Sequence, residues 1–424
     1  MSRRAREEEP RWRPLLEDEL AEQATAAVLD ISSDLRLRRE SLDASLGSGS
    51  AGIALFYDYV AAARLDDDGG RAASTFLDEA VGAAAGGAIG PSLYAGFGGV
   101  AWASTLVDNG PGAADDEFGE VDDVLVAFTS RSPWPYDYDL IRGLVGHGVY
   151  ALERISLPAA ARVLEQVVAR LAELAEHRRD GTTWFTRPEL LPPDTRRAFP
   201  RGYYDVGVAH GVAGVIALLA GCVAAGVAAD VAGELLEGAA SWLLDQRLPD
   251  GAPGRFPAVV TPGTPRDAAR AAWCYGDPGI ASALLLAARA TGAETWERAA
   301  IETALAAARR APGTAGVRDA CLCHGAAGLA HVLNRLHQTT GDEDLRDAAV
   351  HWYRATLRMR HPGGGVAGFT TWSETSENET GMVADPGFLQ GAAGIGLSLA
   401  AAIAPIEPRW DRALLLSHRA DDGL

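Results

Sequence analysis

A pair of glycines three residues apart recurs along the whole chain, and no other feature limits the possible folds as strongly. The first glycines of successive pairs are separated by 47, 47, 68, 65, 49 and 66 residues. A repeat of this length indicates one supersecondary unit that buries its hydrophobic face only against its neighbours. The seven pairs are Gly49/Gly52, Gly96/Gly99, Gly143/Gly146, Gly211/Gly214, Gly276/Gly279, Gly325/Gly328 and Gly391/Gly394.

Each unit is predicted to hold one apolar helix and one amphipathic helix. Most pairs are followed by an apolar run, such as residues 215–219, and a helix that is apolar all round must be buried on all sides. Between the pairs, stretches such as residues 163–174 carry an apolar stripe at helical spacing. These patterns predict a double-layered, all-α ring, with the glycines allowing tight turns where the inner helices begin. A linear helical solenoid is the alternative, since it has the same repeat but need not close.

Composition agrees with one large helical unit. The chain is 48% hydrophobic, rich in alanine and leucine and low in aromatic residues, which favours helices. We expect a single domain over residues 1–424, with loop insertions near residues 112–123, 182–204, 251–266 and 363–385. The net charge of −19 argues against nucleic acid as a partner, because such binding needs a positive surface.

The cellular compartment is predicted from the cysteines and the N-terminus. Four cysteines in 424 residues are too few for a disulfide framework. The first residues have no apolar segment behind their arginines, so no signal peptide is expected. Residues 206–229 carry no formal charge but contain His210 and five glycines, and we interpret them as a turn followed by a buried helix. A reducing cytoplasm is the expected location.

A cluster of metal-ligating residue types stands next to three successive glycine pairs. Cys323 and His324 precede Gly325, Cys274 lies two residues before Gly276, and His210 precedes Gly211. Two cysteines and one histidine suffice for a catalytic zinc site with one open position, so four candidates compete for three places.

The remaining two cysteines are interpreted differently. Cys222 lies in an apolar stretch and is expected to be a core residue. Cys321 forms a Cys-x-Cys pair with Cys323 and could bind metal, although it falls outside the register of the repeat.

Four short motifs surround the glycine pairs from the third to the sixth. They are Tyr138-Asp139-Leu140-Ile141-Arg142-Gly143, Ala209-His210-Gly211, Trp273-Cys274-Tyr275-Gly276-Asp277-Pro278-Gly279 and Cys323-His324-Gly325. In this order they resemble the motifs of the lanthipeptide cyclases, the lanthionine synthetase C-like family. The resemblance extends from about the first glycine pair to Gly394. It implies an α/α toroid, a double-layered barrel of seven inner and seven outer helices.

The resemblance also implies roles for individual residues. It makes Cys274, Cys323 and His324 ligands of a zinc ion (Zn²⁺), and it makes His210 a catalytic acid/base. The other catalytic positions that it implies are Asp139, Arg270 and Tyr275.

Two departures from the family pattern concern substrate preference more than chemistry. Residues 204–208 stand where an asparagine and leucines are more usual, and Gln390 stands where glutamate is expected.

The activity implied is closure of thioether rings in a precursor peptide made of leader and core. A cysteine thiol of the peptide adds to dehydroalanine or dehydrobutyrine, giving lanthionine or methyllanthionine. The chain leaves no room for a dehydratase domain ahead of the ring, so a free-standing enzyme with a separate dehydratase is expected. An exporter is a further expected partner, in a membrane-associated complex.

Two other functional classes are the alternatives. One is a zinc protein of the same fold that binds glutathione or peptides without cyclising them. The other is a different helical toroid enzyme, such as a glycosidase or a prenyltransferase. A glycosidase needs paired carboxylates and has no use for Cys274 or Cys323.

Overall fold

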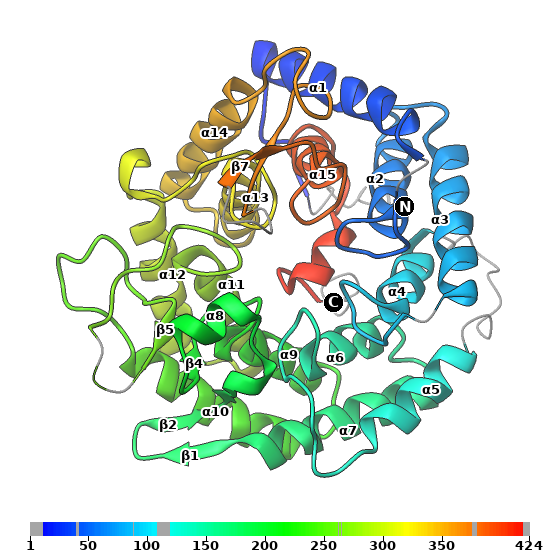
Figure 1. The fold of residues 1–424 in the computed structure, drawn as a ribbon. Coiled ribbons are helices and arrows are strands. Elements are labelled where there is room, and N and C mark those ends of the chain that lie inside the picture. Colours follow the sequence, from blue (N-terminus) through cyan, green and yellow to red (C-terminus); the bar gives the residue numbers. More distant parts are fainter. Residues whose placement is uncertain are drawn as a thin grey trace, which may run out of the picture.

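Seven apolar helices line the inside of a ring, and each begins directly after the first glycine of a pair (Figure 1). This computed structural model describes residues 12–39, 42–87, 89–107, 119–261, 263, 265–374 and 380–418. Because most of their side chains face neighbours, the inner helices are largely apolar, although the one over residues 326–340 also carries His331, Asn334 and Arg335. They are α2 (Ser50–Ala62), α4 (Phe97–Val107), α6 (Leu144–Glu153), α9 (Val212–Ala224), α11 (Asp277–Thr291), α13 (Ala326–Thr340) and α15 (Ala392–Ile403).

Seven amphipathic helices form the outer layer; the first precedes the first inner helix in sequence, and each of the others follows an inner helix. In the helix over residues 158–174, for example, the stripe formed by Val163, Leu164, Val167, Val168 and Leu171 is buried. The sequence prediction of seven inner and seven outer helices is therefore confirmed. The outer helices are α1 (Asp18–Arg36), α3 (Gly69–Gly86), α5 (Gly119–Thr129), α7 (Pro158–Leu174), α10 (Ala229–Asp245), α12 (Glu294–Ala308) and α14 (Glu343–Arg358).

The second glycine of each pair is required by a close backbone approach. A Cβ at Gly328 would collide with the carbonyl oxygen of Leu322, six residues earlier. The same relation holds at all seven pairs, for example between Gly394 and Phe388. The chain before each inner helix is thus folded tightly against the first turn of that helix, and only glycine leaves room for it.

Backbone hydrogen bonds between the turns close the ring. At six of the seven junctions within the described residues, the turn before one inner helix donates a backbone N–H to a carbonyl of the neighbouring turn. One of these bonds joins the last turn to the first, so the chain forms a closed toroid and not a linear solenoid. The donor and acceptor pairs are Leu140 to Ala209, Val208 to Cys274, Cys274 to Cys323, Cys323 to Leu389, Leu389 to Gly47 and Gly47 to Tyr94.

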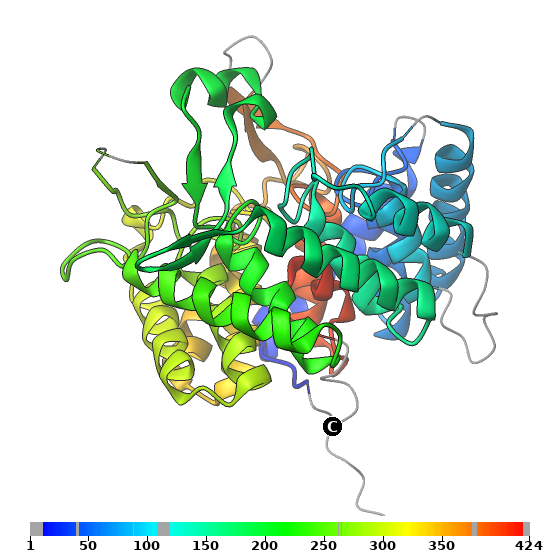
Figure 2. The ribbon, with the colours of Figure 1, turned by 90° about the horizontal axis from the view of Figure 1, so that it is seen from below.

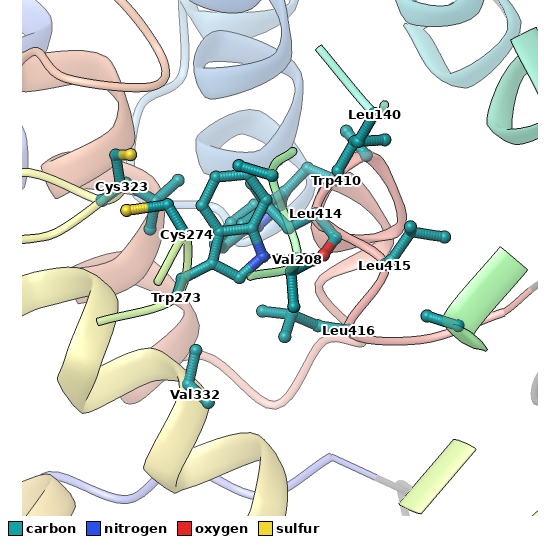
Figure 3. Packing of buried hydrophobic residues seen from close by; sticks show 14 of the residues in the cluster. Leu140, Val208, Trp273, Cys274, Cys323, Val332, Trp410, Leu414, Leu415 and Leu416 are labelled. Carbon is teal, nitrogen blue, oxygen red and sulfur yellow. Dashed lines mark hydrogen bonds between the residues drawn. The ribbon is translucent and has the colours of Figure 1, made fainter. Parts of the chain in front are cut away.

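The C-terminal segment fills the centre of the ring. The 3-10 helix η4 (Arg409–Leu414) lies inside the inner helices, in red in Figure 1. Trp273 Nε1 donates to the carbonyl of Leu414 over 2.8 Å, a contact that Figure 3 shows from close by. The buried carboxylate of Asp411 pairs with His331 Nε2 at 2.9 Å and with Arg335 at 2.7 Å. The ring is therefore a packed barrel and not an open channel.

Short strands and turns lie at the end of the ring where the inner helices begin. The insertion near residues 182–204, expected as loop, forms strands and the short helix α8 (Pro193–Ala198), which rise above the ring in Figure 2. The elements are β1 (Glu176–Arg178) with β2 (Gly181–Thr183), then β3 (Phe185–Thr186), β4 (Tyr203–Asp205) and β5 (Val259–Val260) in one sheet, β6 (Thr371–Glu374) with β7 (Thr380–Val383), and the 3-10 helices η2 (Pro188–Leu190) and η3 (Pro312–Thr314).

The other expected insertions are only partly described. Residues 112–118, 262, 264 and 375–379 lie outside the described residues, and residues 119–123 open helix α5. Among the described helices, none is long and apolar enough to cross a membrane. The uncharged stretch over residues 206–229 contains the buried helix α9, as predicted.

Candidate metal centre and acid–base site

Five of the seven candidate site residues occupy the last two positions before the first glycine of neighbouring turns. Cys274 and Cys323 stand two residues before their glycines, while His210, Tyr275 and His324 stand directly before theirs. Because each turn hydrogen-bonds to the next, these positions line up along one arc of the ring. The repeat therefore brings together residues that are more than 100 positions apart in sequence.

Cys274, Cys323 and His324 form one group of potential metal ligands. Their ligand atoms all lie within 4.8 Å of one another. Cys274 N–H donates to the carbonyl of Cys323 over 3.3 Å, which holds the two turns in register. Figure 3 shows the two cysteine side chains next to each other at the edge of the buried core. Both are buried, with 4% and 7% of their surfaces exposed.

The two thiols influence each other strongly. A hydrogen bond from Cys323 holds the pKa of the Cys274 thiol well below its ordinary value, against the effect of burial. The same contact raises the pKa of Cys323, since two adjacent thiolates would repel each other. A divalent cation would stabilise both as thiolates, and two thiolates with one imidazole are the donor set that a catalytic zinc ion uses.

A second, overlapping group of potential ligands contains Asp319, Cys321 and His324. Cys321, which the sequence analysis set aside, is fully buried, and its sulfur accepts the backbone N–H of His324 at 3.5 Å. Burial raises the pKa of the Cys321 thiol well above its ordinary value. Because His324 belongs to both groups, geometry alone leaves two sulfur atoms besides Cys323 as possible partners of this histidine.

His210 and Asp139 form a hydrogen-bonded pair next to the cysteines. His210 Nδ1 donates to Asp139 Oδ2, and the other oxygen of Asp139 accepts the backbone N–H of Arg142 at 2.7 Å. Burial alone would lower the pKa of His210, but the hydrogen bond and the charges of Asp139 and Asp205 outweigh it and raise this pKa to about 9. At neutral pH the imidazole is therefore protonated, and its side chain is 32% exposed at the mouth of the site.

Tyr275 lies between the histidine and the cysteines. Its ring is nearly parallel to that of His210, with centroids 6.1 Å apart and planes inclined by 28°. The hydroxyl donates to Asp205 Oδ2 over 3.0 Å, and it belongs to the residue that follows Cys274. Asp205 was missed as a site residue, although its segment had been noted as a departure from the family pattern. Burial raises the pKa of Asp205 to about 6.

Arg270 lies on the metal side of the site. Its side chain is exposed, and its positive charge lowers the pKa of both Cys274 and Cys323. Within the described residues its guanidinium makes no hydrogen bond or ion pair. Gln390 is exposed directly before Gly391, the place that His324 occupies in its own turn, and its carbonyl accepts the hydroxyl of Thr371.

Comparison with known proteins agrees with this geometry. A family model described as "Lanthionine synthetase C-like protein" matches residues 40–415. The chain belongs to the lanthionine synthetase C-like family. Among solved structures, it is similar to nisin cyclase, with a TM-score of 0.71 and 19% sequence identity over 93% of this chain and 96% of that one. At that identity the similarity establishes the fold, and no curated protein sequence matches the chain.

Proposed function

We propose that this protein is a zinc-dependent cyclase that forms lanthionine and methyllanthionine rings in a dehydrated precursor peptide. The observation that carries the proposal is the position of the two buried cysteines and His324 beside the hydrogen-bonded pair of His210 and Asp139, in a chain of the lanthionine synthetase C-like family. A thiol-addition enzyme needs a group that keeps a thiol deprotonated and a group that gives up a proton. We assign the first role to a zinc ion on Cys274, Cys323 and His324, and the second role to His210.

The proposed metal ligands are Cys274, Cys323 and His324. Bound there, zinc would supply a cation that keeps the substrate's cysteine deprotonated near neutral pH. The charges of the two protein thiolates cancel that of the ion, so the substrate sulfur stays electron-rich. Three protein ligands leave one position open, as in other catalytic zinc sites.

His210 is the proposed proton donor. The substrate sulfur forms a bond to the β-carbon of the dehydro residue, and the double-bond electrons move to the adjacent carbonyl as an enolate. The imidazolium of His210 then gives its proton to the α-carbon, and the proton released from the thiol restores it. The hydrogen bond to Asp139 keeps the imidazole protonated and correctly oriented for this transfer.

Tyr275 and Arg270 are proposed to position the peptide and stabilise developing charge. The ring of Tyr275 bridges the two halves of the site, and its hydroxyl is fixed by Asp205. Arg270 has an exposed guanidinium close enough to act on the thiols, and it is able to donate to an enolate oxygen.

The partners that we propose are a leader-containing precursor peptide, a separate dehydratase that makes the dehydro residues, and an exporter. All four cysteines are free thiols, which agrees with the proposed reducing, cytoplasmic compartment.

The test uses the whole chain with zinc and a peptide that carries one dehydroalanine and one cysteine. Ring closure leaves the peptide mass unchanged but removes the thiol, so a thiol-alkylating reagent no longer adds to the product. We expect alkylation to be lost with the wild-type protein and retained with the Cys274→Ala, Cys323→Ala variant. Tight peptide binding without loss of the thiol, in fully zinc-loaded protein, would instead support a binding protein of this family.

A further inference from the structure

An aspartate lies six residues before the first glycine of five of the seven pairs. In four of these turns its Oδ1 accepts the backbone N–H two residues further on, which shapes the turn that leads into the inner helix. The acceptor and donor pairs are Asp43 with Ser45 (2.7 Å), Asp205 with Gly207 (2.9 Å), Asp319 with Cys321 (3.0 Å) and Asp385 with Gly387 (2.7 Å). We call these four residues the turn aspartates.

The second carboxylate oxygen of the turn aspartates has a different neighbour in each turn. In Asp205 it accepts the Tyr275 hydroxyl at 3.0 Å. In Asp319 it accepts the backbone N–H of Trp372 at 2.9 Å and lies 3.8 Å from His324 Nε2. The two other turn aspartates face no site residue. Asp43 accepts the Ser48 hydroxyl, and the second oxygen of Asp385 has no hydrogen-bond partner in the described parts of the chain.

We propose that Asp205 and Asp319 are positioning residues, in which the repeated turn aspartate uses its second oxygen to hold a site residue. Asp319 would hold the imidazole of His324, and Asp205 would hold the ring of Tyr275. The assignment deepens the proposed function and rests on it for the catalytic part.

The case for Asp319 begins with a buried nitrogen. His324 Nε2 is inaccessible to solvent and has no hydrogen-bond partner among the described residues. The fully buried carboxylate of Asp319 faces it at 3.8 Å, slightly beyond the length of a hydrogen bond. A histidine that binds a metal through one nitrogen almost always donates its other N–H to such an oxygen.

The carboxylate of Asp319 is itself held from two sides. Its turn bond to Cys321 fixes one oxygen, and the N–H of Trp372 in strand β6 fixes the other. The indole of Trp372 also lies under the guanidinium of Arg318, 4.6 Å from the ring centroid. Because these contacts leave the carboxylate little freedom, it can define the orientation of the His324 ring.

The case for Asp205 rests on the bridge that Tyr275 forms. Asp205 is fully buried, so its oxygen is a fixed acceptor for the Tyr275 hydroxyl. Tyr275 is held at its backbone by the Cys274 turn and at its hydroxyl by Asp205, and its ring is thereby kept parallel to His210. Without the acceptor, the ring would be free to rotate away from the histidine.

Replacing aspartate with asparagine separates the two roles. The amide oxygen still accepts the turn N–H, while the NH₂ group replaces the second oxygen and cannot accept from Tyr275 or Trp372. Asp43→Asn and Asp385→Asn are matched controls, because they keep the same turn bond and touch no site residue. The serine hydroxyl beside Asp43 can reverse its hydrogen bond, and burial raises the pKa of Asp385, so a neutral amide is tolerated there.

For Asp319 the measurement is zinc affinity, by competition with a chromogenic chelator. We expect Asp319→Asn to weaken zinc binding by about 10- to 100-fold, while both control variants stay at the wild-type value. Unchanged affinity in Asp319→Asn, or an equal loss in Asp385→Asn, would overturn the assignment. This readout needs no turnover, so it stands even if the proposed cyclase activity is wrong.

For Asp205 the measurement is coupling to Tyr275. We expect Asp205→Asn to lower kcat by about tenfold with zinc content unchanged, since a charged acceptor is lost. On a Tyr275→Phe background the same change should add much less, because both variants break the same hydrogen bond and only the effect of the lost Asp205 charge on His210 remains.

Independent, additive effects of the two changes would contradict the role of Asp205. If the wild-type protein does not turn over the peptide, the NMR shift of the His210 ring protons provides the same double-variant comparison without substrate. Those shifts report the position of the Tyr275 ring, and additive changes there would likewise reject the proposal.

Discussion

The turns before Gly325 and Gly391 are neighbours in the ring with the same backbone and different chemistry. Each has a turn aspartate, two glycines and a tight approach of the second glycine to a carbonyl six residues earlier. Cys323 N–H donates to the carbonyl of Leu389, which stands at the equivalent place. One turn ends in Cys323-His324 and the other in Leu389-Gln390. The scaffold and the chemistry are therefore separable, because two positions per turn decide whether a turn only closes the ring or also binds a metal.

The comparison extends around the ring. The turns before Gly211, Gly276 and Gly325 contribute the histidines, the tyrosine and the cysteines, and Asp139 comes from the turn before them. The turns before Gly391, Gly49 and Gly96 contribute no ligand or acid/base to this cluster, but they provide the hydrogen bonds that complete the circle. About half of the ring thus carries the site and the other half holds it closed.

The largest expected effect is a difference in zinc content between variants of the turn before Gly325 and variants of the turn before Gly391. Cys274→Ala combined with Cys323→Ala should abolish zinc binding and cyclisation, because one imidazole cannot retain the ion. Leu389→Ala, at the place equivalent to Cys323, should keep one zinc per chain. Elemental analysis of the purified proteins checks both. Full zinc content in the double variant would show that the metal site lies elsewhere.

His210→Ala should keep its zinc but lose activity. The residue is proposed to give a proton, not to bind metal, and general acid/base groups typically contribute a factor of about 10² to 10⁴. The control is Gln390→Ala, an exposed residue directly before its glycine, as His210 is. Thiol alkylation of the peptide measures activity beside metal content. Zinc lost together with activity would make His210 a ligand.

The pH dependence tests the same histidine more finely. The pKa of His210 is raised to about 9, so the ion pair with Asp139 stabilises the fold fully below pH 6.5, and this contribution is lost as the pH rises through about 9. The proton donor disappears over the same range, so kcat should fall above about pH 9. In Asp139→Asn the alkaline limb should move to lower pH. An unchanged limb in that variant would assign it to another group.

The sequence was sufficient to predict the helical repeat and which residues come together. Seven glycine pairs predicted seven inner helices, because each pair lies where only glycine fits. The same register predicted that Cys274, Cys323, His324 and His210 come together. Closure could not be predicted from periodicity, since a solenoid has the same repeat. It depends on the bond between Leu389 and Gly47 and on the C-terminal helix η4 in the centre.

The roles of Asp205 and Asp319 were also not predicted, although a sequence signal existed. An aspartate six residues before the first glycine occurs in five repeats, and it marks the turn. In which of these aspartates the second carboxylate oxygen reaches a site residue depends on the directions of the side chains, and the spacing of residues in the sequence does not determine those directions. The strands in the insertion near residues 182–204 were missed for a related reason, because pairs of two or three residues are too short to show alternation.

A smaller loss of stability, equal in the turns before Gly325 and Gly391, is expected from changes at the glycines that the two turns share. Gly328→Ala and Gly394→Ala each push a Cβ into a carbonyl oxygen, that of Leu322 or Phe388. Each should destabilise the fold by about 1–3 kcal/mol, the usual cost of overpacking. Chemical denaturation measures both. A much larger loss in the metal-binding turn alone would mean that scaffold and site are not separable after all.

The smallest effect is expected at Cys321, where the structure offers a competing ligand set. Cys321 lies near Asp319 and His324, so geometry permits it to replace Cys274 as a partner of the histidine. One observation favours Cys274: the sulfur of Cys321 is fully buried and already accepts the backbone N–H of His324.

Cys321→Ala should therefore leave one zinc per chain and cost only the small packing energy of a buried sulfur, about 1 kcal/mol. Cys222→Ala in helix α9 is the matched control, because that thiol is equally buried and lies among apolar neighbours. Elemental analysis and thermal unfolding compare the two variants. Equal zinc content in both, with similar small losses of stability, fixes Cys274 and Cys323 as the sulfur ligands. Loss of zinc in Cys321→Ala alone would instead assign the metal to Asp319, Cys321 and His324.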